Sequence, residues 1–170
     1  MKKLFALILS LCLLCGCTAL ADNDVTWEQV SALVEDAGIT GNWYTFDDIA
    51  AAIYIPDGLV NSELPGENYI GYLAAEDGSA VALQYVNVDG MDLETYAGLL
   101  PDYGATEIEA GTLNGLPCVT YQVPANKSFN VAFATQAGYI LEAIVAPVTT
   151  EEEMLAANII LASIQPYEAE

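Results

Sequence analysis

The chain of 170 residues contains no histidine and no arginine, and its only basic side chains are those of Lys2, Lys3 and Lys127. Without imidazole there are no Ser-His or Cys-His pairs to activate a nucleophile, and no histidine ligands for a metal. Glycine-rich phosphate-binding motifs of the forms G-x-G-x-x-G and G-x-x-x-x-G-K-[ST] are also missing, so the sequence gives no support for nucleotide binding.

Cysteine is equally scarce outside the first residues of the chain. Cys12, Cys15 and Cys17 lie in or next to an N-terminal apolar run, which leaves Cys118 as the only thiol further along. One thiol can form neither an intramolecular disulfide nor a cysteine-rich zinc site. Because Cys118 lies in the apolar run "LPCVTYQV", we expect it to be buried as a small hydrophobic side chain.

The N-terminus has the features of an export signal. Lys2 and Lys3 precede an apolar run over residues 4–14, which is long enough for a signal peptide but shorter than the ~20 residues that span a bilayer. "ALA" ending at Ala21 resembles a signal-peptidase site, so we expect residues 1–21 to be removed and the protein to be secreted. "LCGC" ending at Cys17 resembles a bacterial lipobox. The alternative is therefore a lipoprotein anchored through Cys17 on the outer face of the cell membrane.

Charge is almost entirely of one sign. After residue 21 a single lysine stands against 24 acidic residues, a net charge of −23 over 149 residues. Such a surface repels nucleic acid and anionic lipid headgroups, whereas it attracts cations and basic protein surfaces. It also favours solubility. The length suits one domain, and no later apolar run is long enough for a transmembrane helix.

Periodicity and turn signals predict an alternation of helices and antiparallel strands. We expect helices at residues 27–37, 92–100 and 151–164, and an apolar face on the last of these formed by Met154, Ala157, Ile160, Leu161 and Ile164. A single strand is expected at residues 49–55, then a hairpin around residues 76–79. Four further strands are expected between residues 105 and 146, with Asn114-Gly115 as the first turn of this meander. Several of these strands are apolar on both faces, which indicates that both faces of the sheet are covered. The sequence therefore predicts an α+β fold: a three-layer α/β/α sandwich with three helices and a mostly antiparallel sheet of six to seven strands.

Three segments, "IYIPDGL", "LNGLPCVTYQV" and "NIILASIQP", resemble the PsbP-like superfamily over about residues 40–166. That superfamily includes the extrinsic PsbP subunit of photosystem II, a Ran-binding nuclear-import factor and bacterial envelope lipoproteins. The resemblance implies the same α/β/α sandwich and mostly non-catalytic roles in binding or assembly, and it transfers no functional residue. Together with the expected signal peptide (1–21) and N-terminal helix (22–39), the resemblance leaves a PsbP-like domain at residues 40–170.

Carboxylates are the remaining candidates for chemistry. Glu142, inside the apolar run "YILEAIV", would be a site candidate if it pointed inward, but we expect it to face solvent or a helix edge. Asp89, Asp92 and Glu94 gather around a Gly turn in "NVDGMDLE", a pattern of oxygen ligands that suits Ca²⁺. A turn and a helix cap explain the same residues, and we prefer that interpretation.

Ten tyrosines are present, of which Tyr69, Tyr72, Tyr85, Tyr121 and Tyr139 could either line a binding face or span the core. We expect a non-catalytic binding or accessory module, secreted or on the cell surface of a bacterium, whose partner is an extracellular protein or a small ligand. The alternatives are a Ca²⁺-stabilised surface protein and a small carboxylate-dependent hydrolase. Catalytic residues and cofactors other than Ca²⁺ are not expected.

Overall fold

The computed structural model describes residues 24–86, 90–135 and 139–167. The three helices are α2 (Trp27–Ala37), α3 (Leu93–Leu99) and α4 (Glu151–Ala162), as the sequence predicts. Two 3-10 turns, η1 (Asp47–Ile49) and η2 (Leu100–Tyr103), accompany them. The strands are β1 (Asp24–Val25), β2 (Gly41–Phe46), β3 (Ala51–Pro56), β4 (Val60–Asn61), β5 (Tyr69–Ala74), β6 (Ala80–Val86), β7 (Thr106–Leu113), β8 (Leu116–Val123), β9 (Ser128–Ala134), β10 (Ile140–Ala146) and β11 (Gln165–Pro166).

The larger sheet has eight strands in the order β1-β7-β8-β9-β10-β6-β5-β4. All its pairs are antiparallel except that of β1 with β7. Its six long strands, β5 to β10, are the hairpin and the meander that the sequence predicts. They could be predicted because turn residues and apolar runs are local signals.

A second, three-stranded sheet has the order β11-β3-β2. The strand expected at residues 49–55 is present as β3, but the strand β2 before it was not predicted. The chain folds back on itself at η1 and pairs β2 with β3. Ala50 makes this reversal possible by adopting a left-handed conformation, with φ of 49°. Alanine seldom adopts that conformation, and no Gly, Asn or Pro stands here to indicate a turn. The sequence therefore contains no signal for the reversal.

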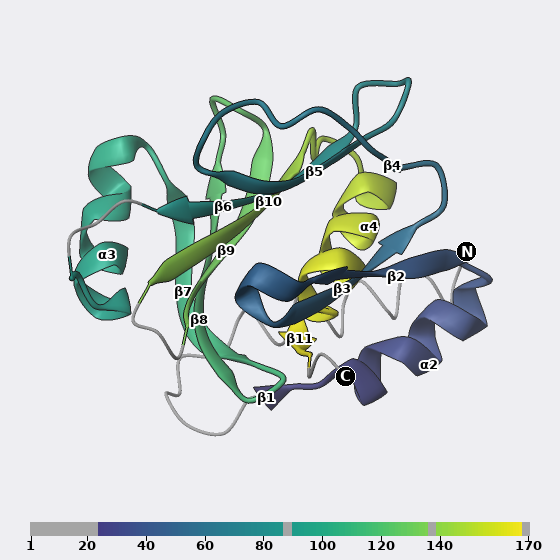
Figure 1. Ribbon diagram of the computed structural model, residues 1–170, viewed down its shortest axis with the longest axis horizontal. Coiled ribbons are helices and arrows are strands. Elements are labelled where there is room, and N and C mark those ends of the chain that lie inside the picture. The colour runs from purple at the N-terminus through teal and green to yellow at the C-terminus, as the bar shows by residue number, and fades with distance from the viewer. Residues whose placement is uncertain (1–23, 87–89, 136–138, 168–170) are drawn as a thin grey trace.

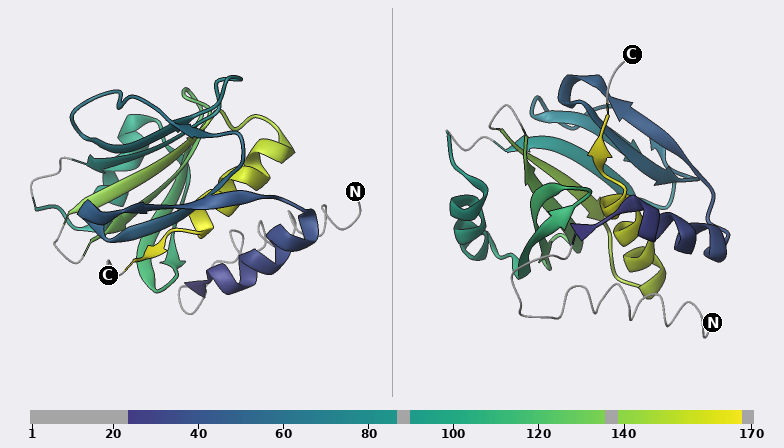
Figure 2. Two further views of the ribbon diagram at one scale, coloured as in Figure 1. Left: turned by 45° about the vertical axis from the view of Figure 1, so that its right-hand side comes forward. Right: turned by 90° about the horizontal axis from the view of Figure 1, so that it is seen from below.

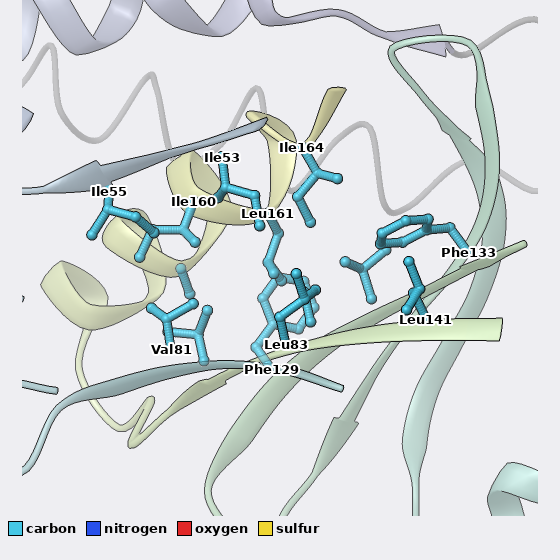
Figure 3. Packing of buried hydrophobic residues seen from close by; sticks show 14 of the residues in the cluster. Ile53, Ile55, Val81, Leu83, Phe129, Phe133, Leu141, Ile160, Leu161 and Ile164 are labelled. Atoms are coloured by element: carbon cyan, nitrogen blue, oxygen red, sulfur yellow. The ribbon is translucent and has the colours of Figure 1, made fainter. Parts of the chain in front are cut away.

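The two faces of the large sheet carry separate apolar clusters. One face packs on α4 and β3, with Ile53, Leu141 and Ile160 fully buried in its core (Figure 3). The opposite face packs on α3 and η2 through Tyr96 and Leu100. Figures 1 and 2 show α3 on one side of the sheet, and α4 with the small sheet on the other. The expected α+β sandwich with both sheet faces covered is therefore confirmed.

Helix α4 is buried on more than the predicted face. Ala157, Ile160 and Leu161 face the large sheet, as expected. Leu155, Ile159 and Ala162 form a second contact surface with Val30 and Val34 of α2. A helix enclosed on two sides needs apolar residues around most of its circumference, which explains why no single stripe describes it.

The capping boxes predicted at the starts of α2 and α4 are both present. At α4, Thr150 Oγ1 accepts a hydrogen bond from the Glu153 N–H at 3.2 Å, and Glu153 Oε2 accepts one from the Thr150 N–H at 2.8 Å. At α2, Gln29 Oε1 accepts from the Thr26 N–H at 3.2 Å. These reciprocal bonds satisfy backbone donors that a helix start otherwise leaves unpaired.

Asn114 holds three distant segments together. Its φ of 48° forms the turn between β7 and β8, together with Gly115 at 78°. Its Oδ1 accepts a hydrogen bond from the Trp27 N–H at 2.6 Å, and its Nδ2 donates to the carbonyls of Ala162 and Ile164 at 3.0 and 2.7 Å. The same side chain therefore joins the start of α2 and the end of α4 to the sheet.

Candidate functional site

The residues of the calcium prediction do not act together in the part of the chain that the structure describes. Asp92 is the N-cap of α3, where its Oδ1 accepts a hydrogen bond from the Thr95 N–H at 2.8 Å. Hydrogen bonding from the Thr95 side chain, and then from its N–H, holds the pKa of Asp92 below its ordinary value. Glu94 lies exposed in the first turn, and Asp89 lies outside the described residues. Within residues 24–86, 90–135 and 139–167, no three acidic or thiol side chains group to hold a metal. Calcium binding stays a prediction.

The two processing sites, at Cys17 and Ala21, also lie outside the described residues and stay predictions. Among the helices that are described, none combines the length and apolar character needed to cross a bilayer. Cys118 is buried in β8, as expected.

Glu142 points inward, so the preferred interpretation that it faces solvent was wrong. Its side chain is only 8% exposed and lies on the α3 face of the large sheet. The Tyr121 hydroxyl donates a hydrogen bond to Oε1, and Gln84 Nε2 donates to Oε2 at 2.6 Å. The hydroxyl of Tyr96 lies 3.1 Å from that of Tyr121 and completes the network. A buried carboxylate needs such donors, because its desolvation is otherwise costly.

Four elements bring this network together. Gln84 is the β6 residue directly paired with Glu142 on β10, whereas Tyr121 comes from β8, two strands away across β9. Tyr96 enters from α3 above the sheet. Sequence reasoning missed this set because β10 is apolar on both faces, so that alternation did not indicate which face Glu142 takes.

Electrostatics keep both phenols of the network protonated. Burial, followed by the negative charge of Glu142, raises the pKa of Tyr121 far above its ordinary value. The same two causes raise the pKa of Tyr96. The sole basic side chain of the described residues, Lys127, is exposed in the turn between β8 and β9. Glu142 is therefore stabilised by neutral donors rather than by a cation.

The Glu142 network has the properties of a structural polar cluster. Each of its four side chains is hydrogen-bonded to another member, and no buried side-chain nitrogen or oxygen in the described part of the chain lacks a partner. A general acid or base needs an approach for the substrate atom with which it exchanges a proton. Here both carboxylate oxygens of Glu142 already accept hydrogen bonds from Gln84 and Tyr121. The role that the geometry supports is therefore to join β6, β8, β10 and α3.

The five tyrosines considered for a binding face do not form one. Tyr121 belongs to the cluster under α3, whereas Tyr85 packs with the cluster under α4. Tyr85 and the exposed Tyr139 meet edge to face, with ring centroids 5.9 Å apart. The set is therefore divided between the two faces of the sheet.

The free edge of the small sheet is a different kind of candidate. Strand β2 lies at this edge, on the side of β3 opposite to β11 (Figure 1). Its sequence, GNWYTF, contains neither a charged residue nor proline, the usual devices that protect an edge strand from pairing. Sequence reasoning missed it because it did not predict the β2–β3 pairing.

The register shows which backbone groups of β2 face outward. The Asp57 N–H donates to the Thr40 carbonyl at 2.9 Å, and hydrogen-bonded pairs of an antiparallel ladder alternate with pairs that are not hydrogen-bonded. Gly41, Trp43 and Thr45 therefore direct their N–H and C=O groups away from β3. Opposite Trp43, the Tyr54 N–H donates to Ser163 Oγ at 2.8 Å rather than to β2, as this alternation requires.

An aromatic cluster marks the middle of this edge. Trp43 meets Trp27 of α2 and Tyr54 of β3, with ring centroids 5.1 and 5.8 Å away, and both contacts are edge to face. Trp27 and Tyr54 also contact each other at 5.2 Å. Trp43 is nevertheless 41% exposed. Its ring is held on one side and open on the other, as in an aromatic anchor for a partner.

Comparison with known proteins finds similarity to solved structures only at the level of the fold. No family model and no curated relative matches the chain. Among solved structures, the chain is similar to the Ran-binding protein Mog1p of Saccharomyces cerevisiae, with 12% sequence identity, a TM-score of 0.44, and coverage of 75% of this chain and 96% of that one. At this level the similarity assigns neither a family nor a partner to the chain.

Proposed function

We propose that the protein is a non-catalytic binding module that engages another protein through the free edge of β2 and the exposed face of Trp43. The observation that carries the proposal is the combination of an uncharged six-residue edge strand with outward backbone groups and a partly exposed, firmly packed tryptophan. In extended-peptide recognition, main-chain hydrogen bonds along a sheet edge supply affinity, and side chains beside that edge supply specificity.

The location belongs to the same proposal. The apolar leader and the acidic composition support a secreted or cell-surface protein of a bacterium, released after Ala21 or anchored through Cys17. The PsbP-like resemblance agrees with a role in binding rather than in catalysis. The Glu142 network supports this choice over the hydrolase alternative, because its carboxylate oxygens are engaged within the fold.

Site-specific photo-crosslinking in the exporting cell tests the proposal. An aromatic photoreactive residue in place of Trp43 should give a protein-sized adduct, because it keeps a ring at this position and the position faces the partner. The matched control is the same residue in place of Val60, which is 62% exposed on the short edge strand β4 of the other sheet. No adduct at position 43, or an adduct at both positions alike, would contradict the proposal. Substrate turnover that Glu142→Gln abolishes would favour the hydrolase instead.

A further inference from the structure

The edge of β2 is unusual for this protein because it lacks charge where the rest of the surface is strongly acidic. Residues 22–170 carry 24 acidic side chains, yet none lies between Gly41 and Phe46. Acidic residues stand instead at both ends of the strand: Asp57 beside its start and Asp47 directly after its end, both exposed. An uncharged pairing edge is therefore bounded by negative charge.

The carboxylate at the start of the strand is held in place. Asp57 Oδ2 accepts a hydrogen bond from Thr40 Oγ1 at 2.5 Å, and its Oδ1 accepts one from Asn42 Nδ2 at 3.2 Å. Burial, and then the negative charge of Asp57, raises the pKa of Tyr54. The charge of Asp57 therefore acts on the aromatic cluster. Asp57 lies on the face of Asn42, whereas the indole of Trp43 lies on the opposite face. A cation at the start of the strand is therefore attracted by the charge of Asp57, and a cation over the indole by its ring quadrupole.

No hydrogen bond among the described residues engages the outward backbone groups of Gly41, Trp43 and Thr45. These alternate residues repeat along the edge at the spacing with which a neighbouring strand would bind. A residue placed directly opposite Trp43 on such a strand has its side chain on the same face as the indole.

From these observations we propose that the partner presents an extended segment carrying Lys or Arg, which adds to β2 as a further strand of the small sheet. The inference rests on the proposed function and specifies the chemistry of the partner at the same site. The basic side chains of the segment lie over Trp43 and beside Asp57 and Asp47.

A second copy of the protein is the main competing occupant, and charge disfavours it. Antiparallel pairing of β2 with its own copy would place Asp57 of each molecule near Asp47 of the other. It would also bring together two molecules that each carry a net charge of −23 over residues 22–170. Charges within about 10 Å repel at ordinary ionic strength, so this pairing loses stability at both ends.

Selection from a library of random linear peptides displayed on phage tests the inference with the purified protein. The enriched peptides should alternate β-branched or aromatic residues with Lys or Arg, and their binding should weaken as salt is raised. Trp43→Lys should weaken the binding of the selected peptides by about tenfold or more, because it removes the aromatic anchor and adds like charge. The matched control Val60→Lys should leave binding unchanged.

A second variant removes one outward donor while leaving the side chain of Trp43 intact. Thr45→Pro deletes an N–H that faces away from β3, a position at which an edge strand tolerates proline. It should also abolish binding, with far-ultraviolet circular dichroism confirming that the fold remains.

The outcomes separate the two proposals. Failure to enrich any peptide, together with no crosslinked adduct at position 43, would overturn both. Enriched peptides that are acidic, or that bind equally well to Trp43→Lys and Thr45→Pro, would overturn the strand-addition inference and leave a binding module. A dimer that sedimentation detects in the unmodified protein and not in Trp43→Lys would show that a second copy occupies the edge.

Discussion

The hydroxyl of Tyr121 on β8 donates a hydrogen bond to Oε1 of Glu142 on β10, across the intervening strand β9. Both side chains are buried, and the contact joins residues 21 positions apart in the sequence. Because the carboxylate is stabilised by neutral donors alone, the loss of one donor leaves it poorly solvated.

Tyr121→Phe should therefore lower the free energy of unfolding by about 1.5–3 kcal/mol, the cost of losing a hydrogen bond to a charged group. The double variant Tyr121→Phe with Glu142→Leu should lose less than the sum of the two single changes, because both polar partners are replaced together. Urea unfolding of the three variants measures this coupling. Tyr103→Phe is the control, since Tyr103 is exposed and its replacement should cost less than about 0.5 kcal/mol. Additive losses would show that the two groups are not coupled.

Alkaline pH should destabilise the protein through the same network. The pKa values of Tyr96 and Tyr121 are raised in the folded state above the ordinary value of 10.0, first by burial and then by the charge of Glu142. Above pH 10 the unfolded chain releases these protons while the folded protein keeps them. The contribution of these two tyrosines to the free energy of unfolding is therefore fully present below pH 10. Above pH 10, each tyrosine lowers the free energy of unfolding by up to about 1.4 kcal/mol per pH unit. Urea unfolding at pH 8 and about pH 11 measures how much free energy of unfolding is lost between the two pH values. This loss should be smaller for Tyr121→Phe than for the unmodified protein. An equal loss for the unmodified protein and Tyr121→Phe would show that groups other than Tyr121 cause the alkaline instability.

Asn114 should contribute more to stability than its place in a turn suggests. Asn114→Gly keeps the left-handed backbone and removes the three side-chain hydrogen bonds to the start of α2 and the end of α4. At about 1 kcal/mol for each bond, the expected loss is about 2–3 kcal/mol. Thermal unfolding measures it, and limited proteolysis should cut α2 first in the variant. A melting temperature equal to that of the unmodified protein would show that the side chain contributes nothing beyond the turn.

The close pairing of β2 with β3 can be tested at a single glycine. A Cβ on Gly41 would lie 2.3 Å from the carbonyl oxygen of Ile55, a backbone atom that cannot move without breaking the pair. Gly41→Ala should therefore cost about 1–3 kcal/mol, as overpacking does. Gly111→Ala on β7 is the matched control, because no atom lies within 4 Å of the added methyl. Urea unfolding should separate the two variants, and equal stabilities would mean that β2 does not approach β3 as described.

Calcium can be tested by comparing thermal unfolding with added Ca²⁺ and with a chelator. Asp92 already caps α3, so we expect the two melting temperatures to coincide. A higher melting temperature with Ca²⁺ that Asp92→Asn and Glu94→Gln both remove would instead support the ion site.

Local chemistry explains which features the sequence could predict. The pair Asn114-Gly115 tolerates positive φ, and Thr150 with Glu153 forms a capping box, so each feature is specified by neighbours in sequence. The reversal at Ala50 had no such signal, because its conformation is imposed by the pairing of β2 with β3. Missing that reversal also concealed the edge strand, which is the candidate binding surface.

The burial of Glu142 was unpredictable for a different reason. Its strand is covered on both faces, so alternation of polar and apolar residues is lost. Its two donors, Gln84 and Tyr121, lie 58 and 21 residues away in the sequence. Only the register of the folded sheet brings the three side chains together.

Amide hydrogen exchange along β2 tests the central claim most directly. Among the residues that the structure describes, the outward N–H groups of Trp43 and Thr45 have no acceptor. In the free protein they should therefore exchange much faster than the inward N–H groups of Asn42 and Tyr44, which pair with β3. Adding a selected basic peptide should slow the exchange of Trp43 and Thr45. Binding that leaves these two amides fast, and instead protects residues around Glu142, would contradict recognition through the edge of β2.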